Sequence, residues 1–329
     1  MQLLVVRFTA VAISFCFAVP AWSQGTSKST AQAWPTKPIR VIVNAAAGGS
    51  TDVTARSMAT KLSETLGYPV VVDNRVGAGG LIGVETAGKA APDGYTLLHA
   101  SDAGILVSPH LYKMGIDVAR DLVSVAPTAK AALFLIARPG LPVKTLADFV
   151  AYARANPGKL NYGSAGHGTL QHIAAEMMIR ETGFKVVHVP YKGSQQVLVD
   201  LLAGQVDFTF DLGAAIPHIK SGKVRALAVP GTARSPIFPE LPTMAEAGTN
   251  VDITWMSGVY APTGTPRGIV MRLNREIGRG MHAPDTRALL AAMSAEAIPP
   301  MSPEEFAERN RRERERFGAI IRAANIKVN

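Results

Sequence analysis

The chain is nearly free of cysteine, since its 329 residues contain only Cys16. This residue lies inside an apolar N-terminal run, and the bulky Phe15 precedes it where a lipoprotein signal would carry a small residue. We therefore interpret Cys16 as part of a signal segment. Removal of that segment would leave a chain without cysteine, which excludes disulfides, thiol catalysis and cysteine-based metal sites.

Long apolar runs are also missing. The run Phe8–Val19 falls well short of the roughly 20 residues that a membrane-spanning helix needs. A small-x-small sequence follows at residues 21–23, as at a signal-peptidase site. We predict that residues 1–23 form a secretory signal peptide, that residues 24–33 form a short disordered leader, and that the mature chain does not span a membrane.

Basic clusters with interleaved aromatic residues are absent from the body of the chain, although the formal net charge is +9. The dense basic run at residues 304–316 alternates Arg with Glu, which is typical of a solvated helix face. No nucleic-acid partner is therefore expected. A hydrophobic content of 47% with 18% charged residues argues against long disorder, and the length predicts two domains.

The chain does contain alternating strand and helix patterns, which predict an α/β fold with parallel strands. Ile39–Val43 reads as a strand, and the helix after it ends at Gly67. A second series of the same kind begins with a strand at Leu160–Tyr162. Further strands are expected at Val70–Val72, Tyr95–Leu98, Phe134–Ala137, Val186–Val189, Val206–Phe210, Val224–Val229 and Val251–Ser257. Capping-box pairs are expected at Thr145 with Asp148 and at Ser302 with Glu305.

Small residues follow several of these strands. In a parallel sheet such turns meet at one edge, where helix N-termini present N–H groups that suit an anion. The alternative is that the glycines serve only positive φ and close packing. The turns lack the lysine of a P-loop and the spacing of a dinucleotide fingerprint, so no nucleotide cofactor is expected. The small residues concerned are Ala47, Gly48, Gly49, Gly77, Gly79, Gly80, Gly163, Ser164, Gly166 and Gly168.

A catalytic interpretation depends on Ser164. The sequence around it resembles a nucleophile elbow only loosely, because Tyr162 stands where glycine is needed. The alternative is a hydroxyl that caps the turn or binds a ligand. A secreted hydrolase using Ser164 with His167 or His188 stays open as a competing hypothesis, but no catalytic residue is predicted.

Polar residues elsewhere have similar alternatives. His172 and Glu176 lie one helical turn apart and could ligate a metal with His167, but we interpret them as a solvated pair and predict no metal site. His188 is expected to be a satisfied core or edge histidine. Asp211 follows an apolar strand, where it either accepts a ligand hydroxyl or ammonium or caps the next helix.

Several ordered segments of the sequence resemble the Bug family of extracytoplasmic solute receptors, which serve tripartite tricarboxylate transporters. These segments are WPTKPIRVIVNAAAGGSTDVTAR, VVVDNRVGAGGLIG, KAAPDGYTLL, NYGSAGHGTLQHIAAE, HVPYKGSQQVLVDLLAGQVDFTFD, PHIKSGKVRALAV and LPTMAEAG. The resemblance implies a type II periplasmic binding-protein fold, with crossing strands near Phe134 and Trp255. One domain would contain residues 34–132 and 257–329, and the other residues 133–256.

The resemblance also implies the function and its site. Backbone groups of two loops would hold a ligand carboxylate, partly through water, with no cofactor. The receptor would be a periplasmic monomer that delivers its ligand to membrane transporter subunits, although a signalling partner is equally compatible with the cleft. His167 would add a donor to the ligand or face solvent. The predicted ligand-binding residues are Ala46, Ala47, Gly48, Gly49, Thr51, Ser164, Gly166, His167, Gly168, Thr169 and Asp211.

One departure from the family pattern lies in the first loop. Family members commonly carry a proline and an aromatic residue after the first strand, whereas this chain has Asn44 and Ala45. Loss of the aromatic residue is expected to widen one wall of the cleft and to change its polarity. The identity of the ligand therefore does not transfer from any one relative.

Overall fold

The structure of the protein is a computed structural model that describes residues 34–231, 233–323 and 325–327. The predicted signal peptide, the leader and Cys16 lie outside these residues. The described residues from Pro35 onward form one compact unit. None of the helices in the described residues is both long enough and apolar enough to cross a membrane.

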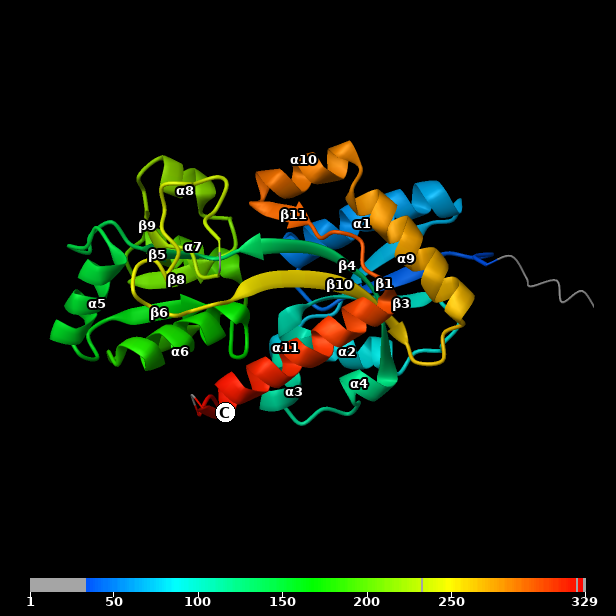
Figure 1. Cartoon of the computed structure of the whole chain (residues 1–329), viewed down its shortest axis with the longest axis horizontal. Helices are drawn as coiled ribbons and strands as arrows, with labels where there is room; N and C mark the ends of the chain where they lie inside the picture. The colour runs from blue at the N-terminus through cyan, green and yellow to red at the C-terminus, as the bar shows by residue number, and fades with distance from the viewer. Residues whose placement is uncertain (1–33, 232, 324, 328–329) are drawn as a thin grey trace, which may run out of the picture. The chain divides into compact units, whose positions relative to one another are not determined.

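The first of two β-sheets has six strands in the order β11-β4-β10-β3-β1-β2 (Figure 1). Strand β1 pairs in parallel with β2 and β3, while β10 runs antiparallel to both β3 and β4. The strands are β1 (Ile39–Val43), β2 (Val70–Asn74), β3 (Thr96–Ser101), β4 (Leu122–Ala132), β10 (Thr254–Pro262) and β11 (Ala295–Ala297).

The second sheet has five strands in the order β7-β6-β8-β5-β9. Strand β6 pairs in parallel with β7 and β8, and β5 runs antiparallel to β8 and β9. The strands are β5 (Phe134–Ala137), β6 (Asn161–Ser164), β7 (Val187–Pro190), β8 (Phe208–Asp211) and β9 (Arg225–Ala228).

The chain passes from the first sheet to the second between β4 and β5, and it returns at β10. Phe134 begins β5 and Trp255 lies in β10, so both changes of sheet fall beside the predicted crossing points. The prediction of parallel strands was wrong for β5 and β10, and β11, which is also antiparallel to its neighbour, was not predicted. Helical crossovers impose a parallel arrangement, whereas β5 and β10 arrive directly from the other sheet.

Helices cover the two sheets, and the C-terminal helix lies beside N-terminal elements of the first sheet (Figure 1). The described helices are α1 (Ser50–Leu66), η1 (Ala78–Gly80), α2 (Leu81–Gly88), η2 (Ala103–Val107), α3 (Ser108–Leu111), α4 (Val118–Asp121), α5 (Leu146–Ala155), α6 (Leu170–Thr182), α7 (Ser194–Leu202), α8 (Ile216–Lys220), α9 (Arg267–Met281), α10 (Pro284–Ala292) and α11 (Pro303–Ala323).

Local signals in the sequence account for the ends of several helices. Helix α1 ends where Gly67 adopts φ 75°, a left-handed conformation that glycine tolerates best. The predicted capping box of α5 is confirmed, because the Thr145 hydroxyl accepts the Asp148 N–H while the Asp148 carboxylate accepts the Thr145 N–H. The same reciprocal pair forms between Ser302 and Glu305 before α11.

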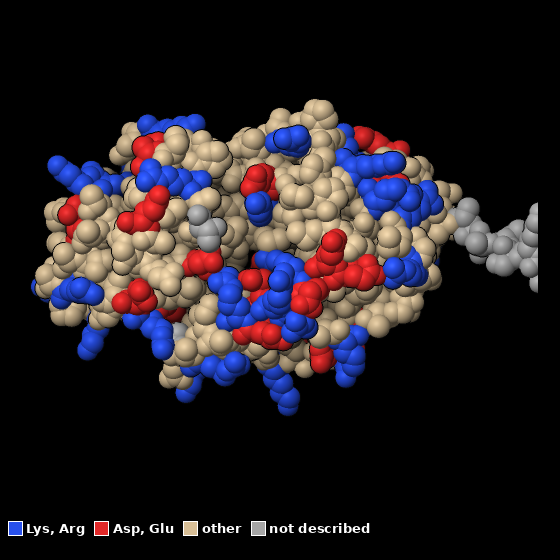
Figure 2. Space-filling model, in the orientation of Figure 1, with Lys and Arg blue, Asp and Glu red and all other residues tan. Residues whose placement is uncertain are grey.

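The charged run of α11 is a solvated face only in part. Figure 2 shows acidic and basic side chains interspersed over this helix, and Arg311 pairs with exposed glutamates there. Arg309 instead reaches inward to Asp102, with both guanidinium contacts at 3.0 Å. The side chain of Asp102 is only 3% exposed, so this ion pair ties α11 to the end of β3 inside the protein.

Candidate functional site

The first predicted ligand loop connects β1 to α1 and is exposed at Ala46, Ala47 and Gly48. The Gly48 N–H donates to the Asp52 carboxylate at 2.9 Å, and the Gly49 N–H donates to the Ala46 carbonyl at 3.3 Å. Two of the backbone donors expected to face a ligand are therefore already bonded within the loop. Among the described residues, the N–H groups of Ala46 and Ala47 form no hydrogen bond.

Asp52 holds this loop in place from the first turn of α1. Its side chain is 2% exposed and accepts hydrogen bonds from Arg56 and Asn74 besides Gly48. Burial by itself would raise the pKa of Asp52, but the bonds from Arg56, Gly48 and Asn74 outweigh burial and hold the pKa below its usual value. The carboxylate is thus a stable anchor for the turn. Thr51, also in the predicted set, is buried beside it.

Asn44, the departure from the family pattern, is buried rather than displayed on the surface. Its side-chain oxygen accepts the Ser101 N–H at 3.3 Å. A Cβ atom at Gly80 or Gly104 would come within 2.6 or 2.2 Å of the Asn44 side-chain nitrogen. The lack of side chains at these glycines therefore leaves space for the Asn44 amide. Inside the protein this amide is paired through its bond with the Ser101 N–H.

The second predicted loop runs from Ser164 to Thr169, between β6 and α6, and side chains satisfy most of its N–H groups. Gly166 donates to the Ser164 hydroxyl, and Gly168 donates to His172 Nδ1 at 3.1 Å. Ala165 donates to the side chain of Gln171. Thr169 caps α6, because its hydroxyl accepts the His172 N–H. As in the first loop, hydrogen bonds within the protein already occupy these backbone donors.

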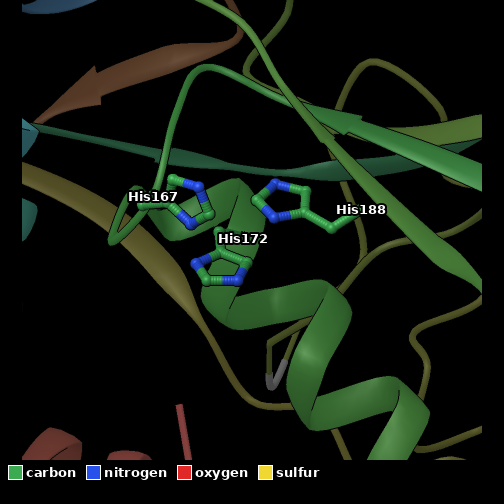
Figure 3. Close-up of side chains that lie close together, drawn as sticks. All are labelled: His167, His172 and His188. Carbon is green, nitrogen blue, oxygen red and sulfur yellow. The ribbon is translucent and has the colours of Figure 1, made fainter. Parts of the chain in front are cut away.

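Three histidines come together behind the second loop: His167 from the loop, His172 from α6 and His188 from β7 (Figure 3). The rings of His172 and His188 are stacked, with centroids 4.3 Å apart and planes 7° apart. His167 stands nearly perpendicular to both, with its centroid 5.6 and 5.0 Å from theirs. We call these three residues the histidine cluster.

The interpretation of His172 and Glu176 as a solvated pair was wrong. His172 is only 5% exposed, and Glu176 accepts a hydrogen bond of 2.6 Å from the Tyr162 hydroxyl. Helix α6 has a second covered face, because His188 of the edge strand β7 stacks on the ring of His172. His167 is partly exposed, although its Nδ1 atom is buried and has no hydrogen-bond partner among the described residues, so the choice between a ligand donor and a solvent-facing histidine stays a prediction.

The pKa values of His172 and His188 favour the neutral rings. Burial, with a smaller contribution from the neighbouring His167, lowers the pKa of His172 to about 4. Burial also lowers the pKa of His188 to about 3, with His172 and His167 adding to the effect. The bond from Gly168 agrees with this, since an N–H donor requires a bare Nδ1 on His172.

The ring nitrogens of the histidine cluster lie within 4.8 Å of one another, a spacing that raises the question of a metal ion. A histidine nitrogen binds zinc in the plane of its ring, at roughly 2.0 to 2.1 Å. The nearly parallel planes of His172 and His188 do not meet at that distance. In this arrangement the cluster does not fit an ion held by all three rings.

Ser164 and His188 form a close contact, with Oγ and Nε2 2.7 Å apart. A serine nucleophile must be reachable by its substrate, however, and Ser164 is fully buried at 0% exposure. Its hydroxyl also contacts the Gly166 carbonyl at 3.1 Å. The contact is therefore a structural hydrogen bond between β6 and β7. His188 is the satisfied edge histidine that the sequence predicts.

Asp211, at the end of β8, lies in a buried turn. One of its carboxylate oxygens accepts the N–H groups of Gly213 and Ala215 at 2.7 and 2.9 Å. The carboxylate thus holds the turn before α8 but does not cap that helix, whose N-cap is Ala215 without a side-chain hydrogen bond, so the predicted cap was wrong and the ligand contact stays a prediction. Burial raises the pKa of Asp211, although these backbone donors oppose the shift.

The second loop also contacts η1 and α3, which lie along the chain between strands of the first sheet. The Tyr112 hydroxyl, just after α3, donates to the His167 carbonyl at 3.2 Å. A Cβ atom at Gly79 would lie 3.5 Å from the same carbonyl, and one at Gly168 would lie 2.9 Å from Leu111. No sequence pattern pointed to Tyr112, because the contact joins residues 55 positions apart.

Comparison with known proteins places these features in a family. Residues 54–326 match the family described as Tripartite tricarboxylate transporter family receptor. Protein BugT of Bordetella pertussis is 36% identical over 310 residues, covering 91% of this chain and 93% of BugT.

Solved structures agree with the sequence comparison. A protein of R. palustris solved with adipate is 34% identical with a TM-score of 0.84, covering 89% of this chain and 99% of that protein. MatC of Rhodopseudomonas palustris, solved with bound malate, is 30% identical with a TM-score of 0.81, covering 87% and 99%. The periplasmic binding protein BugD is 31% identical with a TM-score of 0.83, covering 89% of this chain and 99% of BugD, so the chain has the α/β periplasmic binding-protein fold. The chain belongs to the tripartite tricarboxylate transporter receptor family, which includes the Bug proteins.

Proposed function

We propose that the protein is a periplasmic receptor, monomeric after loss of its signal peptide, that captures a small carboxylate-bearing organic acid and delivers it to a membrane transporter. The observation that carries the proposal is the match along nearly the whole chain to a protein solved with adipate, a dicarboxylate. The match to MatC, solved with malate, supports the same ligand class.

The proposed site consists of the two glycine-rich loops. Each loop leads from the carboxyl end of a strand into the N-terminus of a long helix, α1 or α6, where the helix dipole favours an anion. The predicted set stays as proposed, from Ala46 to Gly49 with Thr51, and from Ser164 to Thr169. Asp211 would reach a ligand only through the oxygen that does not accept the Gly213 and Ala215 N–H groups.

Binding would draw together two domains that we place at residues 34–132 with 257–329 and at residues 133–256. The changes of sheet beside Phe134 and Trp255 support these boundaries. The contact of Tyr112 with the His167 carbonyl is a candidate for closing the site. A ligand that prefers the closed arrangement shifts the population toward it.

The test is a thermal-shift screen of the chain from Gln24 with mono-, di- and tricarboxylates. A ligand at about 100 times its Kd stabilises the folded state by about 2.7 kcal/mol, which gives a clear rise in Tm. Adipate, succinate and malate are expected to give the largest shifts. The absence of a shift with every acid would refute the proposal.

A matched pair of variants places the site. Gly48 and Gly67 lie at opposite ends of α1, have φ of 78° and 75°, and have open space where a Cβ would be. Leucine at either position incurs a similar backbone strain, on the order of 1 to 2 kcal/mol. We expect Gly48→Leu to lose the ligand-induced shift and Gly67→Leu to keep it. Equal shifts in both variants would remove the first loop from the site.

A further inference from the structure

The two proposed ligand loops lack a cationic side chain. Residues 44–51 and 163–169 contain neither lysine nor arginine, and His167 is their only residue that can gain a positive charge. The charged groups on the helix behind the first loop, Asp52 and Arg56, already pair with each other. An acid bound at these loops would therefore bring negative charge to a region where the loops supply only backbone dipoles and an imidazole.

His167 is positioned to supply the missing charge. Its Nδ1 atom is buried without a partner among the described residues, which is an unfavourable state for a polar atom. The other two rings have less freedom, because His172 Nδ1 accepts the Gly168 N–H and His188 Nε2 contacts the Ser164 hydroxyl. Among the described residues, His167 is thus the member of the histidine cluster whose ring forms no hydrogen bond, whereas the other two rings each use one nitrogen.

The groups around the His167 ring offer no negative charge to it. It faces the uncharged rings of His172 and His188, and its carbonyl accepts the Tyr112 hydroxyl. Glu176 lies behind His172, 3.9 Å from His172 Nε2, and takes its hydrogen bond from the Tyr162 hydroxyl. No carboxylate contacts the His167 ring among the described residues, so an anion on the loop would be its counter-charge.

We propose that the receptor takes up a proton at His167 when it binds its acid, so that capture is linked to pH. The inference rests on the proposed function and adds the charge of the complex to it. The bound carboxylate gains the protonated ring of His167 as a cationic partner, and the ring gains an anion. The two charges attract each other more strongly in these surroundings than in water. By linkage, affinity rises as pH falls, by up to about tenfold per pH unit for one proton.

The experiment is isothermal titration calorimetry of the chain from Gln24 with adipate, succinate and malate at pH 7.4 in phosphate, HEPES and Tris buffers. The slope of the observed enthalpy against the ionisation enthalpy of the buffer gives the number of protons taken up. The carboxyl groups of these acids titrate well below pH 7.4, as those of aspartate and glutamate do, so they contribute almost nothing at this pH. We expect roughly 0.3 to 1 proton per bound acid, with affinity rising from pH 8.0 to 6.5.

Two variants assign the proton. His167→Asn should bind with no proton uptake and with an affinity that is flat from pH 8.0 to 6.5. His282→Gln, which changes a histidine at the far end of α9, should keep the uptake of the wild type. An uptake below about 0.1 proton in the wild type, or an equal uptake in wild type and His167→Asn, overturns the inference. Binding without uptake would leave the proposed function intact, whereas no binding by any of the three acids would refute both.

Discussion

The stability of the protein should depend on pH through one histidine of the first sheet. His99 in β3 is fully buried, with its Nε2 atom 3.0 Å from the Thr128 hydroxyl. Its Nδ1 atom is buried and has no partner among the described residues. Burial lowers the pKa of His99 to about 3, and the distant charge of Asp52 opposes this only slightly. The informative perturbation is His99→Gln, because glutamine can still bond Thr128 but does not titrate.

The sign follows from the two pKa values. His99 stays neutral in the folded protein down to about pH 3, whereas in the unfolded chain it binds a proton below about pH 6.5. The stabilising effect of neutral His99 is therefore complete above pH 6.5 and is lost progressively as the pH falls from 6.5 toward 3. Each pH unit in that window lowers the free energy of unfolding by about 1.4 kcal/mol, so the loss at pH 5 is about 2 kcal/mol.

The assay is urea unfolding of wild type and His99→Gln at pH 7.5 and pH 5.0. Other titrating groups act in both proteins, so the difference between their pH effects isolates His99. We expect the wild type to lose about 2 kcal/mol more than the variant over this range. His282→Gln serves as a control and should show the pH dependence of the wild type. An equal loss in wild type and His99→Gln would refute the reasoning, whatever their absolute stabilities.

Two further predictions concern contacts that join distant parts of the chain. Arg309→Met leaves Asp102 buried without its partner and should lower the free energy of unfolding by roughly 3 to 5 kcal/mol in urea, whereas Arg311→Met, whose partners are exposed, should cost less than about 1 kcal/mol. Equal losses of unfolding free energy in the two variants would show that the buried pair stabilises the protein no more than the exposed pairs do. Tyr112→Phe removes the donor to the His167 carbonyl and should weaken the binding of adipate about three- to tenfold by calorimetry, and an unchanged Kd would show that the complex does not use this contact.

The sequence predicts well what neighbouring residues determine. The buried face of α1, its end at Gly67 and the capping boxes before α5 and α11 all follow from residues within a few positions of one another. The glycine turns after β1 and β6 were found for the same reason. Their role as ligand loops is still a prediction, because the described contacts show only how each loop is held.

Strand β4 could not be predicted from the strand propensity of its own residues. Its eleven residues, LVSVAPTAKAA, contain Pro127 and four alanines, which favour strands poorly. It nevertheless pairs with β10 along nearly its whole length, and β11 adds a second partner at one end. Pairing with strands more than a hundred residues away overrides weak local propensity. The sequence accordingly predicted neither β4 nor β11, and it predicted β5 and β10 as strands without their antiparallel direction.

The same limit explains the errors at the site. Treating α6 as a helix with one apolar face places His172 in solvent, but six consecutive residues at its start, from Leu170 to Ala175, are buried. Helical periodicity shows which face is most apolar, and it does not show how many neighbours cover the helix. The partner of His172 is His188, which a separate strand brings to it. Arg309 was likewise misread because Asp102 lies 207 positions away.

The two loops suggest how the receptor could favour an acid without a preformed arginine or lysine contact. In the described state Asp52, Ser164, Gln171 and His172 accept four of the loop N–H groups that a carboxylate could use, those of Gly48, Gly166, Ala165 and Gly168. A ligand that takes those donors replaces one acceptor by another, so each exchange gains only a difference between two hydrogen bonds. A neutral oxygen competes poorly with the Asp52 carboxylate, because hydrogen bonds to a charged acceptor are stronger. Ligands with an ionised carboxylate therefore have the advantage, and a cation formed at His167 would increase it.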